Sequence, residues 1–101
     1  MHNRQETAPL FETVKAYKDK KPAYFCIPGH RFDRGIAEEW IQDVGGDIFG
    51  YDLTEAHGLD DLHAPEGAIL EAQTLAAELY GARRSWFLVN GTTCGNEAML
   101  L

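Results

Sequence analysis

Hydrophobic residues recur at helical spacing near the start of the chain. Thr7 followed by Pro9 is typical of a helix N-terminus, and the next apolar side chains fall on one helical face: Leu10, Phe11, Val14 and Tyr17. A second helix is predicted over Gly35–Val44, because its apolar positions lie on or near one face and Gly45-Gly46 can end it. Both stretches therefore predict short amphipathic helices.

The clearest helical pattern runs from Pro65 to Tyr80, with Gly81 at the position that commonly ends a helix. Ser85–Val89 is a continuous apolar run, typical of a strand buried on both faces of a parallel sheet. A shorter apolar run, Ala23–Ile27, predicts another short strand before a Pro-Gly turn. Cys94–Leu101 is compatible with a last helix.

These elements predict an α/β protein. Asp47–Leu62 has no sustained period, and its apolar side chains favour an irregular loop anchored against a surface. We expect residues 1–64 to form a helical and irregular N-terminal segment, and residues 65–101 to begin a larger domain with its first strand and helix. The last helix reaches Leu101 without a stop signal, which favours truncation of a longer enzyme. The alternative is a natural short chain whose last helix docks on its own core.

Composition narrows the class of protein. Hydrophobic residues make up 45% and charged residues 25% of the 101 residues, as in soluble globular domains. No apolar run approaches the length of a membrane span, and the first residues lack the apolar region of a signal peptide, so a cytoplasmic protein is expected. The net charge of −7 opposes binding to nucleic acid or to an anionic membrane. Cys26 and Cys94 belong to no metal-ligand pattern, and no structural disulfide is expected.

The segment Asn90-Gly91-Thr92-Thr93 lies between the predicted buried strand and the last predicted helix. This arrangement presents free backbone N–H groups and hydroxyls at a helix N-terminus, where an anion such as phosphate binds. It is not a Walker loop, because no Gly-Lys-Ser/Thr follows. The alternative is a type I′ hairpin turn at Asn90-Gly91, although the residues that follow do not resemble a returning strand.

Four motifs occur in an order found in one family: Pro28–His30, Tyr51–Glu55, Gly58–Gly67 and Phe87–Asn96. With them, the chain from about Pro9 onward resembles the N-terminal part of the bacterial ornithine/lysine/arginine decarboxylases. These are pyridoxal phosphate enzymes of the aspartate-aminotransferase fold. The resemblance implies a homo-oligomeric enzyme that acts on a basic amino acid and forms polyamine-type amines.

The resemblance also implies that the loop holds the cofactor phosphate through Gly91, Thr92, Thr93 and Cys94, although Cys94 stands where the family commonly has serine. The family's lysine that forms a Schiff base with pyridoxal phosphate lies further along, and so does the acidic partner of the pyridine nitrogen. All four lysines of this chain precede the first glycine: Lys15, Lys18, Lys20 and Lys21. We therefore expect no catalytic residue and no activity in this chain alone. A non-catalytic interaction fragment, or the product of an incomplete gene, is the competing class.

Other residues permit different chemistry. Cys94 at a helix N-terminus has the position of a reactive thiol, but no partner base is identifiable. A metal cluster is not expected, because the spacings between the candidate ligands fit no compact pattern. These candidates are His30, His57, His63, Asp60 and Asp61. Loop-anchoring hydrogen bonds are the expectation for these side chains. The resemblance implies that Asp60 and His63 neighbour the active site.

Overall fold

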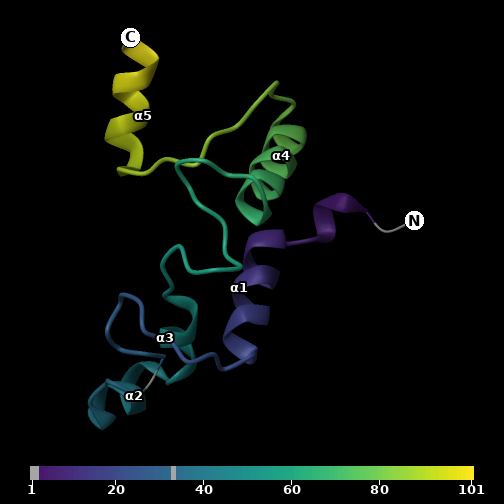
Figure 1. The fold of residues 1–101 in the computed structure, drawn as a ribbon. Helices are drawn as coiled ribbons and strands as arrows, with labels where there is room; N and C mark the ends of the chain where they lie inside the picture. The colour runs from purple at the N-terminus through teal and green to yellow at the C-terminus, as the bar shows by residue number, and fades with distance from the viewer. Residues whose placement is uncertain (1–2, 33) are drawn as a thin grey trace.

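The computed structural model describes residues 3–32 and 34–101 (Figure 1). Within these ranges the chain is helical, and no strand is present. The elements follow in the order η1 (Arg4–Glu6), α1 (Pro9–Asp19), α2 (Glu38–Val44), α3 (Asp47–Tyr51), α4 (Ala68–Tyr80) and α5 (Gly91–Leu100). No helix in the described ranges is long and apolar enough to cross a membrane.

Helix α1 begins at Pro9, as predicted. Proline suits the first helical position because it lacks a backbone N–H, which would have no helical partner there. The predicted cap at Thr7 is wrong. Its hydroxyl donates to the Arg4 carbonyl (2.7 Å), and the helix start is instead supported by Glu12, whose carboxylate accepts from the Ala8 N–H (2.9 Å). The acidic side chain in the first turn also suits the positive end of the helix dipole.

The second predicted helix is present as α2, although it begins at Glu38 rather than Gly35. Gly45 ends it with a φ of 83°, a conformation that favours glycine. The prediction of a wholly irregular Asp47–Leu62 is wrong at its start, because α3 forms there. Gly50 in α3 is buried beneath the alkyl chain of Lys18, where any larger side chain would collide with it.

The predicted helix before Gly81 is present as α4 and ends at Tyr80, but it begins at Ala68 and not at Pro65. Gly81 takes the left-handed conformation (φ 64°) that commonly follows a helix. Helix α4 packs against α1 and buries Leu75 and Ala77. The N-terminal turn η1 lies against it as well, through an ion pair between Arg4 and Glu78 (2.7 Å).

Neither predicted strand forms in the described structure, so the α/β class is not confirmed. Ser85–Val89 joins α4 to α5 without regular secondary structure, pairs with no strand among the described residues, and leaves Trp86 63% exposed. Ala23–Ile27 is also irregular. The physical reason is that a strand buried on both faces needs neighbouring strands for its backbone hydrogen bonds, and no other described segment supplies them.

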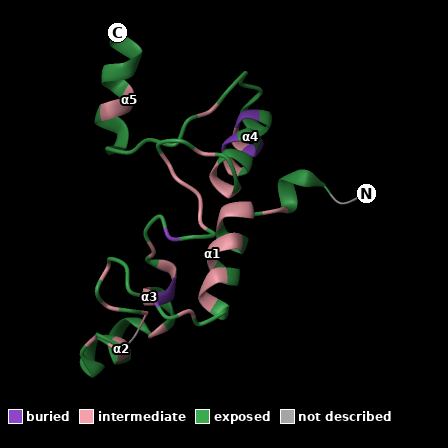
Figure 2. Cartoon of the chain, viewed as in Figure 1, coloured by how far each residue is buried: buried purple, intermediate pink, exposed green. Residues whose placement is uncertain are grey.

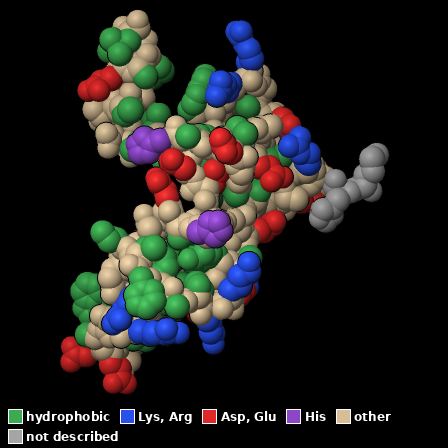
Figure 3. All heavy atoms as spheres, viewed as in Figure 1, with side chains coloured by type: hydrophobic (Ala, Val, Ile, Leu, Met, Phe, Trp, Pro, Cys, Tyr) green, Lys and Arg blue, Asp and Glu red, His purple; other side chains and the backbone are tan. Residues whose placement is uncertain are grey.

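The buried core is small for this length of chain. Four hydrophobic residues are buried among those described, namely Tyr24, Ala56, Leu75 and Ala77 (Figure 2). The radius of gyration is 16.2 Å, against about 13 Å for a compact domain of 100 residues. Figure 3 shows hydrophobic side chains on the open surface at both ends of the molecule, including α5. The described chain therefore leaves much of its apolar surface in solvent.

Candidate functional site

The loop predicted to hold a phosphate lies at the N-terminus of α5. Gly91 is the first residue of this helix and has a φ of 70°, which a residue with a side chain adopts only under strain. The side chain of Asn90 does not cap the helix, and the first turn contains no acidic residue. The N–H groups of the first turn are thus left for a ligand or water. The position of Gly91 is open, because a Cβ there would meet no atom within 4 Å.

The hairpin alternative for Asn90-Gly91 is wrong, since a helix and not a returning strand follows. Thr92 and Thr93 are exposed on the first turn, and Cys94 is partly buried with a free thiol. All four residues proposed for cofactor binding therefore lie in one helical turn. The turn combines N–H groups, two hydroxyls, open space and the positive end of a helix dipole, which are features that a phosphate site uses.

The segment before α5 is in contact with the helix through Leu88. A side chain at Gly95 would collide with the Leu88 Cδ1 atom, because a Cβ there would lie 2.7 Å away. Gly95 thus allows the extended segment to lie close to the helix that follows it. This contact fixes the direction in which the chain enters α5.

Two further motifs are joined by a buried histidine. The His30 side chain is 9% exposed, and its Nε2 lies 3.1 Å from the Asp52 carboxylate. Since a carboxylate only accepts, Nε2 carries the proton of this hydrogen bond. The Nδ1 atom has no partner among the described residues. Arg31, next to His30, adopts a left-handed φ of 48°, so the loop is held in a strained conformation.

Tyr24 makes a second connection between the same segments. Its hydroxyl donates to the Ile27 carbonyl (2.7 Å) and accepts from the Thr54 N–H (3.1 Å). The ring is also in edge contact with Phe32, at 5.4 Å between centroids. The Pro28–His30 and Tyr51–Glu55 motifs, far apart in sequence, are therefore adjacent in the structure.

Asp60, expected near the active site, has a structural role here. Its two carboxylate oxygens accept from four backbone N–H groups at 2.8–3.0 Å: those of Asp61, Glu66, Gly67 and Ile69. The hydrogen bond from the Glu66 N–H is the largest of the effects that lower the Asp60 pKa to about 2. The carboxylate thus caps α4 from seven residues before its N-cap Gly67, whose own position carries no cap.

His63 lies beside two carboxylates. Its Nδ1 is 3.6 Å from an Asp61 oxygen and 3.9 Å from a Glu55 oxygen, and its backbone N–H donates to Asp61 (2.8 Å). The sequence patterns singled out neither Glu55 nor Asp52 as a polar partner. Both belong to the Tyr51–Glu55 motif, and that membership was the one signal available for them.

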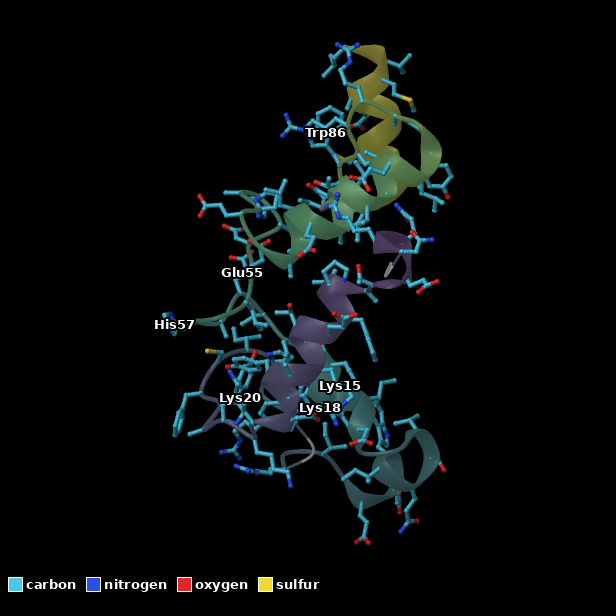
Figure 4. The ribbon with its side chains drawn as sticks, turned by 90° about the vertical axis from the view of Figure 1, so that its right-hand side faces the viewer. Lys15, Lys18, Lys20, Glu55, His57 and Trp86 are labelled. Carbon is cyan, nitrogen blue, oxygen red and sulfur yellow. The ribbon has the colours of Figure 1, made fainter. Side chains whose placement is uncertain are left out.

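The lysines of α1 and of its C-cap lie away from the first turn of α5. Figure 1 shows α5 at one end of the molecule and the carboxyl end of α1 toward the other. Lys15, Lys18 and Lys20, labelled in Figure 4, are in that second part. Lys18 is also engaged with Asp47 (3.1 Å), and this hydrogen bond is the main cause of its raised pKa. These amines are therefore not placed to react with a group held at α5.

Comparison with known proteins identifies the class. The profile of the family described as Orn/Lys/Arg decarboxylase, major domain, matches residues 8–101. The chain belongs to this family.

Individual relatives agree with that assignment. An arginine decarboxylase of Bacillus subtilis is 42% identical over 97 residues, which is 96% of this chain and 20% of that protein. An arginine decarboxylase of Halalkalibacterium halodurans is 40% identical over 99 residues, covering 98% of this chain and 20% of the relative. An ornithine decarboxylase of Haemophilus influenzae is 29% identical over 106 residues, 99% of this chain and 15% of that protein. The chain thus spans about a fifth of the length of the arginine decarboxylases. No solved structure gives a significant match.

Proposed function

We propose that this chain is the cofactor-phosphate-binding segment of a pyridoxal phosphate-dependent decarboxylase of a basic amino acid. The observation that carries the proposal is the uncapped start of α5 at Gly91, Thr92, Thr93 and Cys94, in a chain that belongs to the Orn/Lys/Arg decarboxylase family. The matched relatives named for arginine and ornithine support a basic substrate without selecting one. The complete enzyme is proposed to be a cytoplasmic homo-oligomer.

In this proposal the residues of the chain bind and orient the cofactor. The N–H groups of the first α5 turn and the hydroxyls of Thr92 and Thr93 donate to the phosphate oxygens. Gly91 lets the backbone approach closely, and Leu88 against Gly95 fixes the entry into the helix. The bound cofactor supplies the electron-accepting ring that decarboxylation needs. The amine that binds its aldehyde covalently is proposed to lie in the part of the enzyme that these residues do not include.

We also propose that Ser85–Val89 becomes a buried strand in the complete enzyme. The segment consists largely of bulky apolar side chains that are exposed in this structure. Backbone pairing on both sides would satisfy its N–H and C=O groups, and helices over both faces would cover Trp86 and Val89. This arrangement would place Gly91 at the carboxyl end of a strand, where ligands of parallel sheets bind.

Titration calorimetry of the chain with pyridoxal phosphate and with unphosphorylated pyridoxal tests the phosphate site. Thr92→Val and Thr93→Val remove the two hydroxyls and keep the branched shape of the side chains. Thr74→Val is the matched control, since this threonine lies in α4 and donates to the Leu70 carbonyl (2.9 Å). We expect the double Thr92/Thr93 variant to bind pyridoxal phosphate several-fold more weakly, with Thr74→Val unchanged. Equal binding of pyridoxal and its phosphate by the unaltered chain would contradict the proposal.

A further inference from the structure

The loop between α3 and α4 brings the Glu55 carboxylate, which belonged to no expected ligand set, next to His63 and Asp61. The ligand atoms of Glu55, Asp61 and His63 all lie within 4.8 Å of one another. Glu55 ends the second motif, whereas Asp61 and His63 belong to the third. The cluster thus connects two segments of the loop at its surface.

The spacing in this cluster is too wide for direct hydrogen bonds. His63 Nδ1 is 3.6 Å from Asp61 and 3.9 Å from Glu55, whereas N–H···O bonds span about 2.7–3.2 Å. Tetrahedral ligands at about 2.0–2.2 Å from Zn²⁺ are separated by roughly 3.3–3.6 Å. The separation of 3.6 Å between His63 Nδ1 and Asp61 lies at the upper limit of that range, and rotation of the exposed Glu55 side chain would bring its oxygen, now 3.9 Å from Nδ1, closer.

The backbone that carries two of the three groups is held in place independently. Asp60 fixes the start of α4 through four backbone N–H groups, and one oxygen of Asp61 accepts the His63 N–H at 2.8 Å. The Asp61 oxygen that accepts the His63 N–H is also the oxygen that lies 3.6 Å from the His63 Nδ1, and with one hydrogen bond it keeps a lone pair for a metal ion. No side-chain hydrogen bond of Glu55 or of the His63 imidazole occurs among the described residues.

We propose that Glu55, Asp61 and His63 bind one divalent transition-metal ion, with Zn²⁺ as the probe. One imidazole and two carboxylates are a ligand set that Zn²⁺ accepts, and water completes its coordination. The bound ion would tie the second motif to the third and rigidify the loop that enters α4. The site goes beyond the proposed decarboxylase function and needs no pyridoxal phosphate.

Calorimetric titration of the unaltered chain with Zn²⁺, without pyridoxal phosphate, tests the site. Three variants each remove one ligand with little change of shape: Glu55→Gln, Asp61→Asn and His63→Gln. Asp61→Asn keeps the oxygen that accepts the His63 N–H, so the turn is preserved. The control is His57→Gln, because His57 is an exposed imidazole of the same loop that points away from Glu55 (Figure 4). Both free cysteines remain in every protein, so binding to thiols cancels in the comparison.

We expect the unaltered chain to bind one equivalent of Zn²⁺. The His63→Gln variant should bind it at least tenfold more weakly, and the His57→Gln variant should bind it as the unaltered chain does. The imidazole NMR signals provide a second readout, in which His63 shifts on addition of Zn²⁺ and His57 does not. Far-ultraviolet circular dichroism of the variants checks that the helices persist. An absence of saturable binding by the unaltered chain, or equal binding by the His63 and His57 variants, would overturn the proposal. Because the cofactor is absent throughout, such a failure leaves the phosphate site unaffected.

Discussion

The carboxylate of Asp60 replaces a cap that the residues next to α4 do not provide. Gly67 has no side chain to accept from the first turn, and Asp60 accepts from the Gly67 and Ile69 N–H groups instead. A Cβ at Gly67 would lie 3.6 Å from the carboxylate, an ordinary contact. The negatively charged carboxylate of Asp60, through its two oxygens, therefore determines where α4 begins.

Asp60→Asn should shorten α4 at its N-terminus. The amide keeps one accepting oxygen but turns an N–H₂ group toward two of the backbone donors, so we expect a cost of about 1–2 kcal/mol. Amide hydrogen exchange of residues 67–71 should accelerate relative to that of residues 75–79. Asp61→Asn is the control, because its oxygen keeps the bond from the His63 N–H. Unchanged exchange in the Asp60 variant would refute the capping role.

Acid should weaken the same helix start. The folded-state pKa of Asp60 is lowered from 3.8 to about 2, mainly by the hydrogen bond from the Glu66 N–H. A lowered pKa means that the stabilisation is complete above the unfolded-state value and is lost as the pH falls through the folded-state value. We therefore expect α4 protection to decline between about pH 4 and pH 2. Carboxyl NMR titration should give Asp60 a midpoint near pH 2, and a midpoint near pH 4 would contradict the structure.

Helix α5 forms in the described chain, whereas the segment before it has no sheet to join and forms no strand. Gly91 opens the helix in a left-handed conformation, and Gly95 leaves room for Leu88. The strand predicted before them does not form, and the segment has no regular secondary structure. A helix makes its backbone hydrogen bonds within one segment, whereas a strand needs a neighbouring strand to make them.

Gly91→Ala tests the start of α5. Its φ of 70° costs a residue with a Cβ about 1–2 kcal/mol, so the first turn should unwind or shift. Gly29→Ala is the matched control, because a Cβ there also meets no atom within 4 Å but its φ is not positive. Backbone chemical shifts of residues 91–94 should lose helical character in the first variant and keep it in the second. Helical shifts retained in Gly91→Ala would show that the turn does not need glycine.

The described chain is not compact, because few of its helix faces pack against another helix. Helices α1 and α4 share the main contact, and the second group of buried residues gathers around Tyr24. Leu100 is 87% exposed and Trp86 63% exposed. With so little apolar surface buried, the hydrophobic contribution to folding is small for 101 residues.

The isolated chain should therefore lack a sharp thermal transition. We expect helical circular dichroism that declines gradually with temperature, together with binding of the dye ANS to exposed apolar surface. A Trp86→Ser variant should bind less of the dye, whereas Lys20→Ser, on an exposed polar position, should bind the same amount. A cooperative transition without dye binding would show that the chain buries its apolar side chains better than this structure does.

The isolated chain should also show no decarboxylase activity toward lysine, arginine or ornithine with excess pyridoxal phosphate. Covalent catalysis needs an amine at the cofactor, and no lysine occurs after Lys21. Because free pyridoxal phosphate decarboxylates slowly by itself, the release of CO₂ is compared with the cofactor alone. Activity well above that background, abolished by substitution of Lys15, Lys18, Lys20 or Lys21, would contradict this prediction.

The sequence by itself determined that α1, α2, α4 and α5 form and where some of them end, together with the family. Pro9 and Gly81 mark helix ends in the structure because their backbone preferences act locally. The order of the four motifs identified the decarboxylase family, which the profile match over residues 8–101 confirms. The phosphate-binding role of residues 91–94 stays a prediction, although the helix that it requires is present.

Only the tertiary structure decided which distant side chains meet and which segments stay open. Helix α3, the Asp60 cap, the His30–Asp52 pair and the Glu55–Asp61–His63 cluster depend on how the loop folds back, and no local pattern encodes that path. The predicted buried strand at Ser85–Val89 does not form for the same reason, because a strand needs a neighbouring strand and no described segment provides one. Helix bonds close within a few residues, whereas sheets and side-chain clusters need contacts between segments far apart in the chain.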